Sequence, residues 1–96
     1  MSKSIHDKIA ERIAKKIGTE YKAYKGIDIV KDKVIEVETK RNSLSQGLQQ
    51  VIRSQKPRYL AVNDPNIKNA LEITKGTGVG VMGPTGRIIK RASGKR

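Results

Sequence analysis

The chain contains no cysteine, tryptophan or phenylalanine, and His6 is its only histidine. The absence of cysteine excludes a disulfide scaffold, a zinc–thiolate site and cysteine catalysis. A single imidazole also excludes a histidine-rich metal site, so we expect any metal ion to be a hard cation held by carboxylates and backbone oxygens. Because tyrosine occurs only three times, the composition argues against base stacking on an aromatic platform as the main binding mode.

Acidic residues are also scarce. The sequence has 21 Lys and Arg but only nine Asp and Glu, and 21 − 9 gives a net charge of +12 over 96 residues. The commonest soluble partner of such a charge is a polyphosphate, and we expect DNA. The residues expected to contact its phosphates are Arg41, Arg53, Lys56, Arg58, Arg91, Lys95 and Arg96.

Long apolar runs are missing, and no signal peptide or lipidation motif is visible. We therefore expect no membrane partner and a cytoplasmic protein that acts on intracellular DNA, in association with the nucleoid. An anionic membrane surface is a weaker alternative, because the sequence shows no strongly amphipathic helix with aromatic anchors.

Hydrophobic periodicity predicts a first helix from residue 4 to about residue 20. Ser4 is placed to cap its start and Gly18 to end it. The apolar residues of this helix recur every four positions and are expected to form its inner face: Ile5, Ile9, Ile13 and Ile17.

The remaining segments alternate between extended and helical patterns. A hairpin (26–30 and 34–40) is followed by a helix capped by Ser43 or Asn42, a buried strand (59–62), a helix opened by Asp64-Pro65, and two strands (79–82 and 87–91). We therefore predict an α/β fold, a mixed β-sheet flanked by helices in the order α-β-β-α-β-α-β-β, with parallel pairing across the helical crossovers. Residues 1–96 are expected to form a single domain, with a flexible basic tail from about 92 to 96.

Three of the nine acids, Asp28, Glu36 and Glu38, lie on the predicted hairpin. Alternation places Glu36, Glu38 and Lys40 on one face. A three-residue loop at 31–33 pairs Asp28 with Glu36, whereas a two-residue loop turns Asp28 to the other face. Directly opposed carboxylates destabilise a hairpin unless a proton or cation compensates them, so the cluster suggests a divalent metal site.

These features resemble the PD-(D/E)xK nuclease superfamily, whose restriction-endonuclease-like fold also includes archaeal Holliday-junction resolvases. The resemblance covers most of the chain, from Ile5 to about Met82. The stretches that carry it are Gly26-Ile27-Asp28, Val34-Ile35-Glu36-Val37-Glu38-Thr39-Lys40, the helix with Gln46, Gln49 and Gln50, and the buried strand Tyr59-Leu60-Ala61-Val62.

The resemblance implies a role for each matching residue. Asp28 and Glu38 would hold Mg²⁺ or Mn²⁺, with the Thr39 carbonyl as a further ligand. Lys40 would stabilise charge or orient the attacking water, and Gln49 would assist from the next helix. The sequence departs from the family at Ile27, which replaces the motif proline. The first helix of the family often contributes a glutamate to the site, and the matching residue here would be Glu11 or Glu20.

A second register is open. In the motif Glu36-x-Glu38, Glu36 becomes the metal-binding acid and a glutamate occupies the lysine position, which is a known variant of the family.

The favoured function is a metal-dependent deoxyribonuclease that hydrolyses DNA phosphodiester bonds. The alternative is a non-catalytic basic DNA-binding protein on the same fold, and metal dependence discriminates between the two. We also expect a homodimer, because the core is thin and enzymes that cut both strands commonly use two sites. Its interface is predicted at the apolar strand 79–82 and at Ile88 and Ile89.

Overall fold

The computed structural model describes residues 4–21 and 27–93. Along these residues the order of elements is α1 (Ile5–Ile17), β1 (Ile29–Val30), β2 (Val34–Glu38), η1 (Arg41–Ser43), α2 (Leu44–Val51), β3 (Arg58–Val62), η2 (Asp64–Asn66), α3 (Ile67–Ile73), β4 (Gly80–Met82) and β5 (Ile88–Lys90). The predicted α/β class and the order α-β-β-α-β-α-β-β are confirmed.

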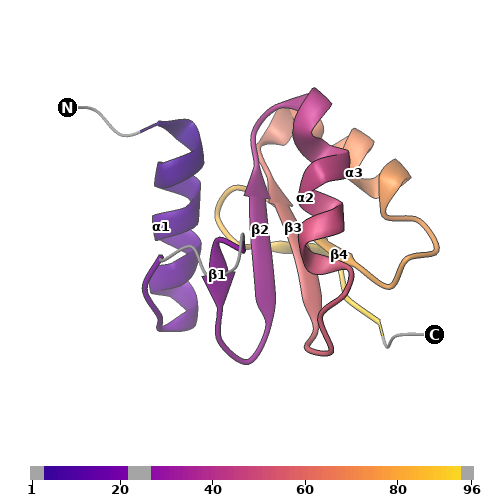
Figure 1. Cartoon of the computed structure of the whole chain (residues 1–96). Helices are drawn as coiled ribbons and strands as arrows, with labels where there is room; N and C mark the ends of the chain where they lie inside the picture. The colour runs from indigo at the N-terminus through magenta and orange to yellow at the C-terminus, as the bar shows by residue number, and fades with distance from the viewer. Residues whose placement is uncertain (1–3, 22–26, 94–96) are drawn as a thin grey trace.

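The five strands form one mixed sheet in the order β1-β2-β3-β4-β5. The central strands β2, β3 and β4 are parallel, and the edge strands β1 and β5 pair antiparallel with their neighbours. Parallel strands need crossover connections, and α2 and α3 provide them. Crossovers between parallel strands are almost always right-handed. Because β2 to β3 and β3 to β4 are steps in the same direction across the sheet, α2 and α3 lie on the same face. Figure 1 shows them on the face opposite α1.

Each face of the sheet has its own apolar core. Ile35 and Val37 of β2 pack with α1, whereas Val34 packs with α2 and α3. Because successive side chains of a strand point to opposite faces, Glu36 and Glu38 of β2 project to the side of α2. The two acids are thereby kept out of the core beneath α1.

The first helix has the predicted caps but a different inner face. The Ser4 hydroxyl accepts from the backbone N–H of Asp7 at 3.1 Å, and Gly18 ends the helix in the left-handed conformation at φ 81°. Ile5, however, is 62% exposed, so its predicted inward position is wrong. A four-residue spacing advances 400° around a helix of 3.6 residues per turn, so the stripe drifts about 40° at each step. The buried positions follow the true period instead: Ile9, Ala10, Ile13 and Ala14.

The C-terminal segment corrects further expectations. Asn63, rather than Asp64, occupies the N-cap position of the turn that leads into α3, and its side chain makes no capping bond. The strand predicted at 79–82 lies between β3 and β5 and is buried along its length, so it cannot supply a dimer surface. Ala92 packs on the α1 core and the N–H of Ser93 donates to the carbonyl of Gly78, whereas residues 94–96 of the expected tail lie outside the described residues.

Candidate functional site

The hairpin between β1 and β2 sets the geometry of the candidate site. Val30 pairs with Val34 and Ile29 with Ile35, which is the register of a three-residue loop. One step further, Asp28 lies opposite Glu36, and its backbone N–H donates to Oε1 of Glu36 at 3.0 Å. Both side chains are buried, at 7% and 8% exposure. The pairing expected for a three-residue loop is therefore observed, but the common face expected of the hairpin acids is not: the Asp28 carboxylate reaches His6 on the side of α1, whereas Glu38 lies against Gly47 of α2.

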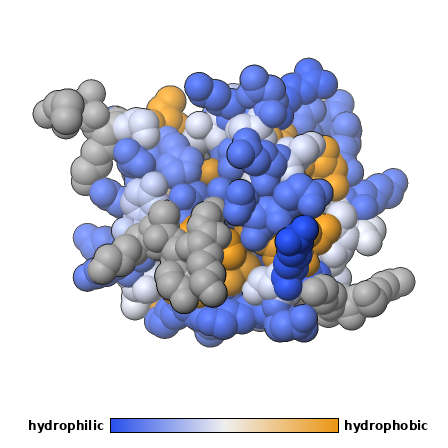
Figure 2. Space-filling model, in the orientation of Figure 1, coloured by the Kyte–Doolittle hydropathy of each residue, from blue (hydrophilic) through white to orange (hydrophobic). Residues whose placement is uncertain are grey.

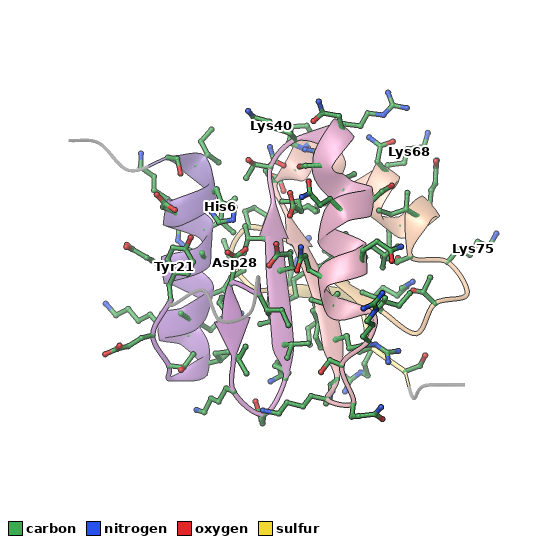
Figure 3. All side chains as sticks on the ribbon, in the orientation of Figure 1. His6, Tyr21, Asp28, Lys40, Lys68 and Lys75 are labelled. Atoms are coloured by element: carbon green, nitrogen blue, oxygen red, sulfur yellow. The ribbon has the colours of Figure 1, made fainter. Side chains whose placement is uncertain are left out.

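The carboxylate of Asp28 is held between the sheet and α1. Its Oδ2 accepts a hydrogen bond from the N–H of Val37 at 2.9 Å, so a side chain here takes the place of a backbone acceptor. The same oxygen lies 3.0 Å from Nε2 of His6, on the first turn of α1. Figure 3 shows Asp28 and His6 facing each other across the gap between the helix and β1.

The buried pair is electrostatically costly. Burial raises the pKa of Glu36 to about 9, and the charge of Asp28 adds to this rise, followed by a smaller contribution from Glu38. The bond from the Asp28 N–H acts in the opposite direction without cancelling the effect. Two carboxylates that face each other away from water cannot both ionise cheaply. This pair therefore requires a shared proton or a cation.

Glu38 is positioned by the helix above it. A Cβ atom at Gly47 of α2 would lie 2.5 Å from Cγ of Glu38 and 2.8 Å from its Oε2. Only glycine allows the helix to approach the glutamate this closely. Glu38 is half-buried and shares the α2 side of the sheet with Glu36, whereas the Asp28 carboxylate contacts His6 of α1.

His6 is a site residue that the sequence patterns did not predict. Its Nδ1 lies 3.4 Å from Oδ1 of Asp7, and the Tyr21 hydroxyl donates to that same oxygen at 3.2 Å. Burial lowers the pKa of His6, but the Asp28 charge and the hydrogen bonds to Asp7 and Asp28 outweigh it and raise the net pKa above 6.5. The helical period contains the missing signal, because two turns of 3.6 residues back from the fully buried Ile13 lead to His6, which lies about 20° from Ile13 around the helix, whereas Ile5 lies about 80° away.

The donor set suits a cation that takes few protein ligands. Within residues 4–21 and 27–93, no group of three or more His, Cys, Asp or Glu side chains is gathered so as to hold a metal ion. Two donors do face each other, namely Nε2 of His6 and Oδ2 of Asp28 at 3.0 Å. Octahedral Mg²⁺ has bonds of about 2.1 Å, which set neighbouring ligand atoms about 3.0 Å apart, and it usually keeps several waters. The same 3.0 Å is the ordinary length of the direct hydrogen bond between these two side chains, so the contact does not by itself mark a metal site.

Lys40 and Thr39, which the Glu38-x-Lys40 motif assigns to the site, do not contact Asp28 or Glu36 in any hydrogen bond between the described residues. Lys40 is exposed and lies beyond Glu38, the last residue of β2. Figure 3 shows it near the top of the molecule, above Asp28. The carbonyl of Thr39 accepts from Nδ2 of Asn66 at 3.2 Å. The acid directly across from Asp28 is Glu36, so the hairpin register favours the Glu36-x-Glu38 motif.

The glutamines of α2 divide between its two flanks. Gln49 is exposed, and the helical spacing of 100° per residue places it on the side of α2 away from Gly47. Gln50 is half-buried and three residues from Gly47, which puts it on the flank above Glu38. Glu11 and Glu20 are both exposed, and the side chain from α1 that contacts Asp28 is that of His6.

One of the expected phosphate contacts is ruled out. Arg58 is 2% exposed, and its guanidinium donates to the carbonyls of Ser54 and Thr77 at 3.2 Å each. It holds the loops before β3 and β4 and has no surface to offer a phosphate. Lys95 and Arg96 lie outside the described residues. The other expected contacts are exposed: Arg41, Arg53, Lys56 and Arg91.

The outer surface suits a polyanion. Figure 2 shows a largely hydrophilic face with scattered apolar patches. Two further exposed lysines, Lys68 and Lys75, lie on and just beyond α3, and Figure 3 shows these two on the side of the molecule away from α1. Ile88 of the edge strand β5 is 43% exposed. It is the part of the predicted dimer surface that remains available, and the homodimer itself stays a prediction.

Among the described segments, no helix is long and apolar enough to cross a membrane. Comparison of the chain with family models, with curated proteins and with solved structures found no match in any of the three. The chain is therefore characterised by its own geometry: a small α/β domain with a five-stranded mixed sheet and a buried acidic pair facing a single histidine.

Proposed function

We propose that this protein is a metal-dependent deoxyribonuclease with a restriction-endonuclease-like arrangement of its site, and that it hydrolyses DNA phosphodiester bonds. One observation carries the proposal. Asp28 and Glu36 oppose each other in a buried position, with Nε2 of His6 3.0 Å from the Asp28 carboxylate. The carboxylate of Asp28 and the imidazole of His6 are side-chain types that bind divalent cations, and a cation would also relieve the repulsion between Asp28 and Glu36.

A purely structural explanation of the pair is weak. Buried like charges cost stability, and an apolar pair at these positions would continue the sheet without that cost. The chain as a whole carries a charge of +12, so acids on it weaken its attraction for a polyphosphate. A cation between acid and phosphate removes both objections, because it compensates the carboxylates and attracts the phosphate.

The hairpin register supports Asp28, Glu36 and Glu38 as the working acids. Asp28 and His6 would bind Mg²⁺ or Mn²⁺, which supplies positive charge that polarises the phosphodiester and lowers the pKa of an attacking water. Glu36 orients Asp28 by accepting from its N–H. Glu38 is half-buried beneath Gly47 and is the acid with access to solvent, which suits it to accept a proton from the attacking water. Gln50 is better placed than Gln49 to assist from α2.

A cleavage assay tests the proposal. Wild-type protein is incubated with a panel of linear, branched and single-stranded DNAs in Mg²⁺, in Mn²⁺ and in chelator. Asp28→Asn is compared with Asp32→Asn, a matched control that removes the same charge from the exposed turn of the same hairpin. We expect metal-dependent cleavage by the wild type and by Asp32→Asn, and none by Asp28→Asn. Equal cleavage by both variants would place the chemistry elsewhere.

The net charge of +12 favours a second candidate, a non-catalytic DNA-binding protein on the same fold. That protein would bind through Lys and Arg contacts to phosphates and would bind equally well in chelator. Failure of the wild type to cut any DNA of the panel in either metal, together with chelator-independent binding, would favour this candidate.

A further inference from the structure

The outer face of α2 carries amide side chains where charges would be expected. The eight residues of this helix include no Asp, Glu, Lys or Arg, although 31% of the chain is charged. Figure 1 shows α2 on the outside of the sheet, and the side that it buries consists of Leu44, Gly47, Leu48 and Val51. On the opposite side, exposed residues follow the helical spacing i, i+4, i+7 and i+11, which forms one outward row: Asn42, Gln46, Gln49 and Arg53.

The first helix shows what a merely solvated face looks like in this chain. The exposed side chains of α1 mix both signs of charge: Lys8, Glu11, Arg12, Lys15 and Lys16. Such a face needs only water. A glutamine differs because its amide presents a donor and an acceptor side by side. The row on α2 is therefore suited to hydrogen bonds with a partner that offers both kinds of group.

Cations stand at both ends of the uncharged row. Lys40 and Arg41 precede α2, and Arg53 and Lys56 follow it, all of them exposed. No Asp or Glu occurs between residues 39 and 63, and the carboxylate of Glu38 lies beneath the helix, against Gly47. This arrangement is complementary to a groove of DNA, in which phosphates form the walls and the hydrogen-bonding edges of the bases form the floor.

We propose that α2 enters the major groove of duplex DNA, where Gln46 and Gln49 bind the edges of adenine bases and the flanking Lys and Arg residues contact phosphates. The proposal rests on the DNA partner of the proposed function and not on its cation site. It therefore holds equally for a nuclease and for the non-catalytic candidate.

The dimensions of the helix fit this groove. An α-helix with its side chains is about 10–12 Å across, and the major groove of B-DNA is about 12 Å wide. The three residues from Gln46 to Gln49 rise about 4.5 Å along the axis, and base pairs are about 3.4 Å apart, so the two amides meet neighbouring base pairs. Adenine offers the N7 acceptor and the N6 donor that one glutamine amide can bind together.

Neighbouring elements leave the row free for this role. Gln50 lies on the flank above Glu38, so the part assigned to α2 in cleavage makes no use of Gln46 or Gln49. The adjacent helix α3 contributes further exposed cations beside the row, Lys68 and Lys75, with Glu72 between them. These two lysines add positive charge where a phosphate backbone would follow the wall of the groove.

The test measures DNA binding by the full chain in chelator, so that neither metal nor cleavage contributes. Sequences bound by the wild type are selected from DNA duplexes with randomised central base pairs, and we expect neighbouring A·T pairs. Combined Gln46→Ala and Gln49→Ala should weaken binding to the selected duplex about tenfold to a hundredfold and abolish the preference, with an unchanged slope of log K against log salt. Gln55→Ala is the matched control, because it removes an exposed glutamine outside the row, and it should bind like the wild type.

A second measurement uses the wild-type protein alone. Replacing the selected adenines by 7-deazaadenine removes the N7 acceptor from the major groove and leaves base pairing intact, and it should weaken binding about tenfold. Arg41→Ala should behave differently from the glutamine variants. It should weaken binding to every duplex alike and change the salt slope by about 0.9, as one lost phosphate contact.

The outcomes separate this proposal from the proposed function. A wild type that selects no sequence, a glutamine variant that keeps the preference, or binding that is insensitive to 7-deazaadenine would each overturn the role of α2, whether or not the protein cuts DNA. Loss of the preference in the glutamine variant but not in Gln55→Ala supports it, even where no DNA is cut in any metal. Far-ultraviolet circular dichroism checks that each variant folds.

Discussion

Nε2 of His6 lies 3.0 Å from Oδ2 of Asp28, although 22 residues separate the two in the chain. This is the length of a direct hydrogen bond in which a protonated Nε2 donates to the carboxylate. Burial lowers the pKa of His6, but the charge of Asp28 and the hydrogen bonds to Asp7 and Asp28 raise it overall, which favours the protonated imidazole. Within the described parts of the chain, this is the contact that joins the first helix to the acids of the hairpin through polar side chains, and the following predictions probe the site around it.

Metal-free protein should lose stability as the pH rises, because of Glu36. The folded state raises the pKa of Glu36 from 4.5 to about 9 through burial and the neighbouring Asp28. Its stabilising contribution is therefore complete below about pH 4.5 and is lost as the pH rises toward 9. Glu36→Gln stays neutral, so in chelator its free energy of unfolding should exceed that of the wild type at pH 8, and the difference should shrink toward pH 5.

Urea denaturation at a series of pH values measures this difference. Mg²⁺ or Mn²⁺ at pH 8 should stabilise the wild type, because a ligand that binds only the folded state raises its stability. Parallel pH profiles for wild type and Glu36→Gln would show that the Asp28 and Glu36 pair carries no such strain.

The catalytic register can be decided by two substitutions. Since Glu36 lies opposite Asp28 and Lys40 is exposed beyond the end of β2, we expect Glu38→Gln to lower kcat about a hundredfold or more, the scale of lost general-base catalysis. Lys40→Ala should leave kcat within about threefold and affect DNA affinity instead, as the loss of one phosphate contact. A collapse of kcat in Lys40→Ala with unchanged affinity would restore the Glu38-x-Lys40 register.

Gly47→Ala should destabilise the protein, against the usual preference for alanine in helices. Alanine in a helix is favoured over glycine by about 1 kcal/mol, but here the new Cβ would lie 2.5 Å from Cγ of Glu38. Overpacking of this kind costs about 1–3 kcal/mol, so the net change in the free energy of unfolding should be a loss. In a Glu38→Ala background the obstacle is gone, and Gly47→Ala should become stabilising. Thermal denaturation of the four proteins checks this reversal of sign, and a loss of equal size in both backgrounds would contradict it.

Arg58→Ala should reduce stability while leaving the electrostatics of DNA binding unchanged. The substitution removes the donors to the part-buried carbonyls of Ser54 and Thr77, at a cost on the order of 1 kcal/mol for each lost hydrogen bond. Because Arg58 has no exposed surface, the slope of log K against log salt should match the wild type. Arg91→Ala removes an exposed arginine and should change that slope by about 0.9 if the residue contacts a phosphate. A reduced slope in Arg58→Ala would mean that the arginine reaches DNA after all.

Local patterns in the sequence were sufficient for the order of the elements. The alternation of β-branched residues in 34–38 and the apolar run at 59–62 indicate strands without reference to the rest of the chain. Ser4 and Gly18 delimit α1 through hydrogen bonds and backbone conformation within one turn. The excess of positive charge is likewise a property of composition. These features are determined by neighbours in sequence, so they can be read from it.

The candidate site depended on contacts between distant segments. Whether Asp28 lies opposite Glu36 depended on the length of the loop between β1 and β2. The sequence allowed a loop of two or of three residues, and the observed pairing of Val30 with Val34 is that of the three-residue loop. Arg58 looked like a surface cation until β3 was placed at the centre of the sheet. His6 became a site residue because α1 packs with its period of 3.6 and not four, which turns Ile5 outward and the imidazole toward Asp28. Strand register, the burial of Arg58 and the orientation of His6 depend on how helices and strands that are distant in the chain pack against each other. They are therefore decided by the tertiary structure and not by local sequence patterns.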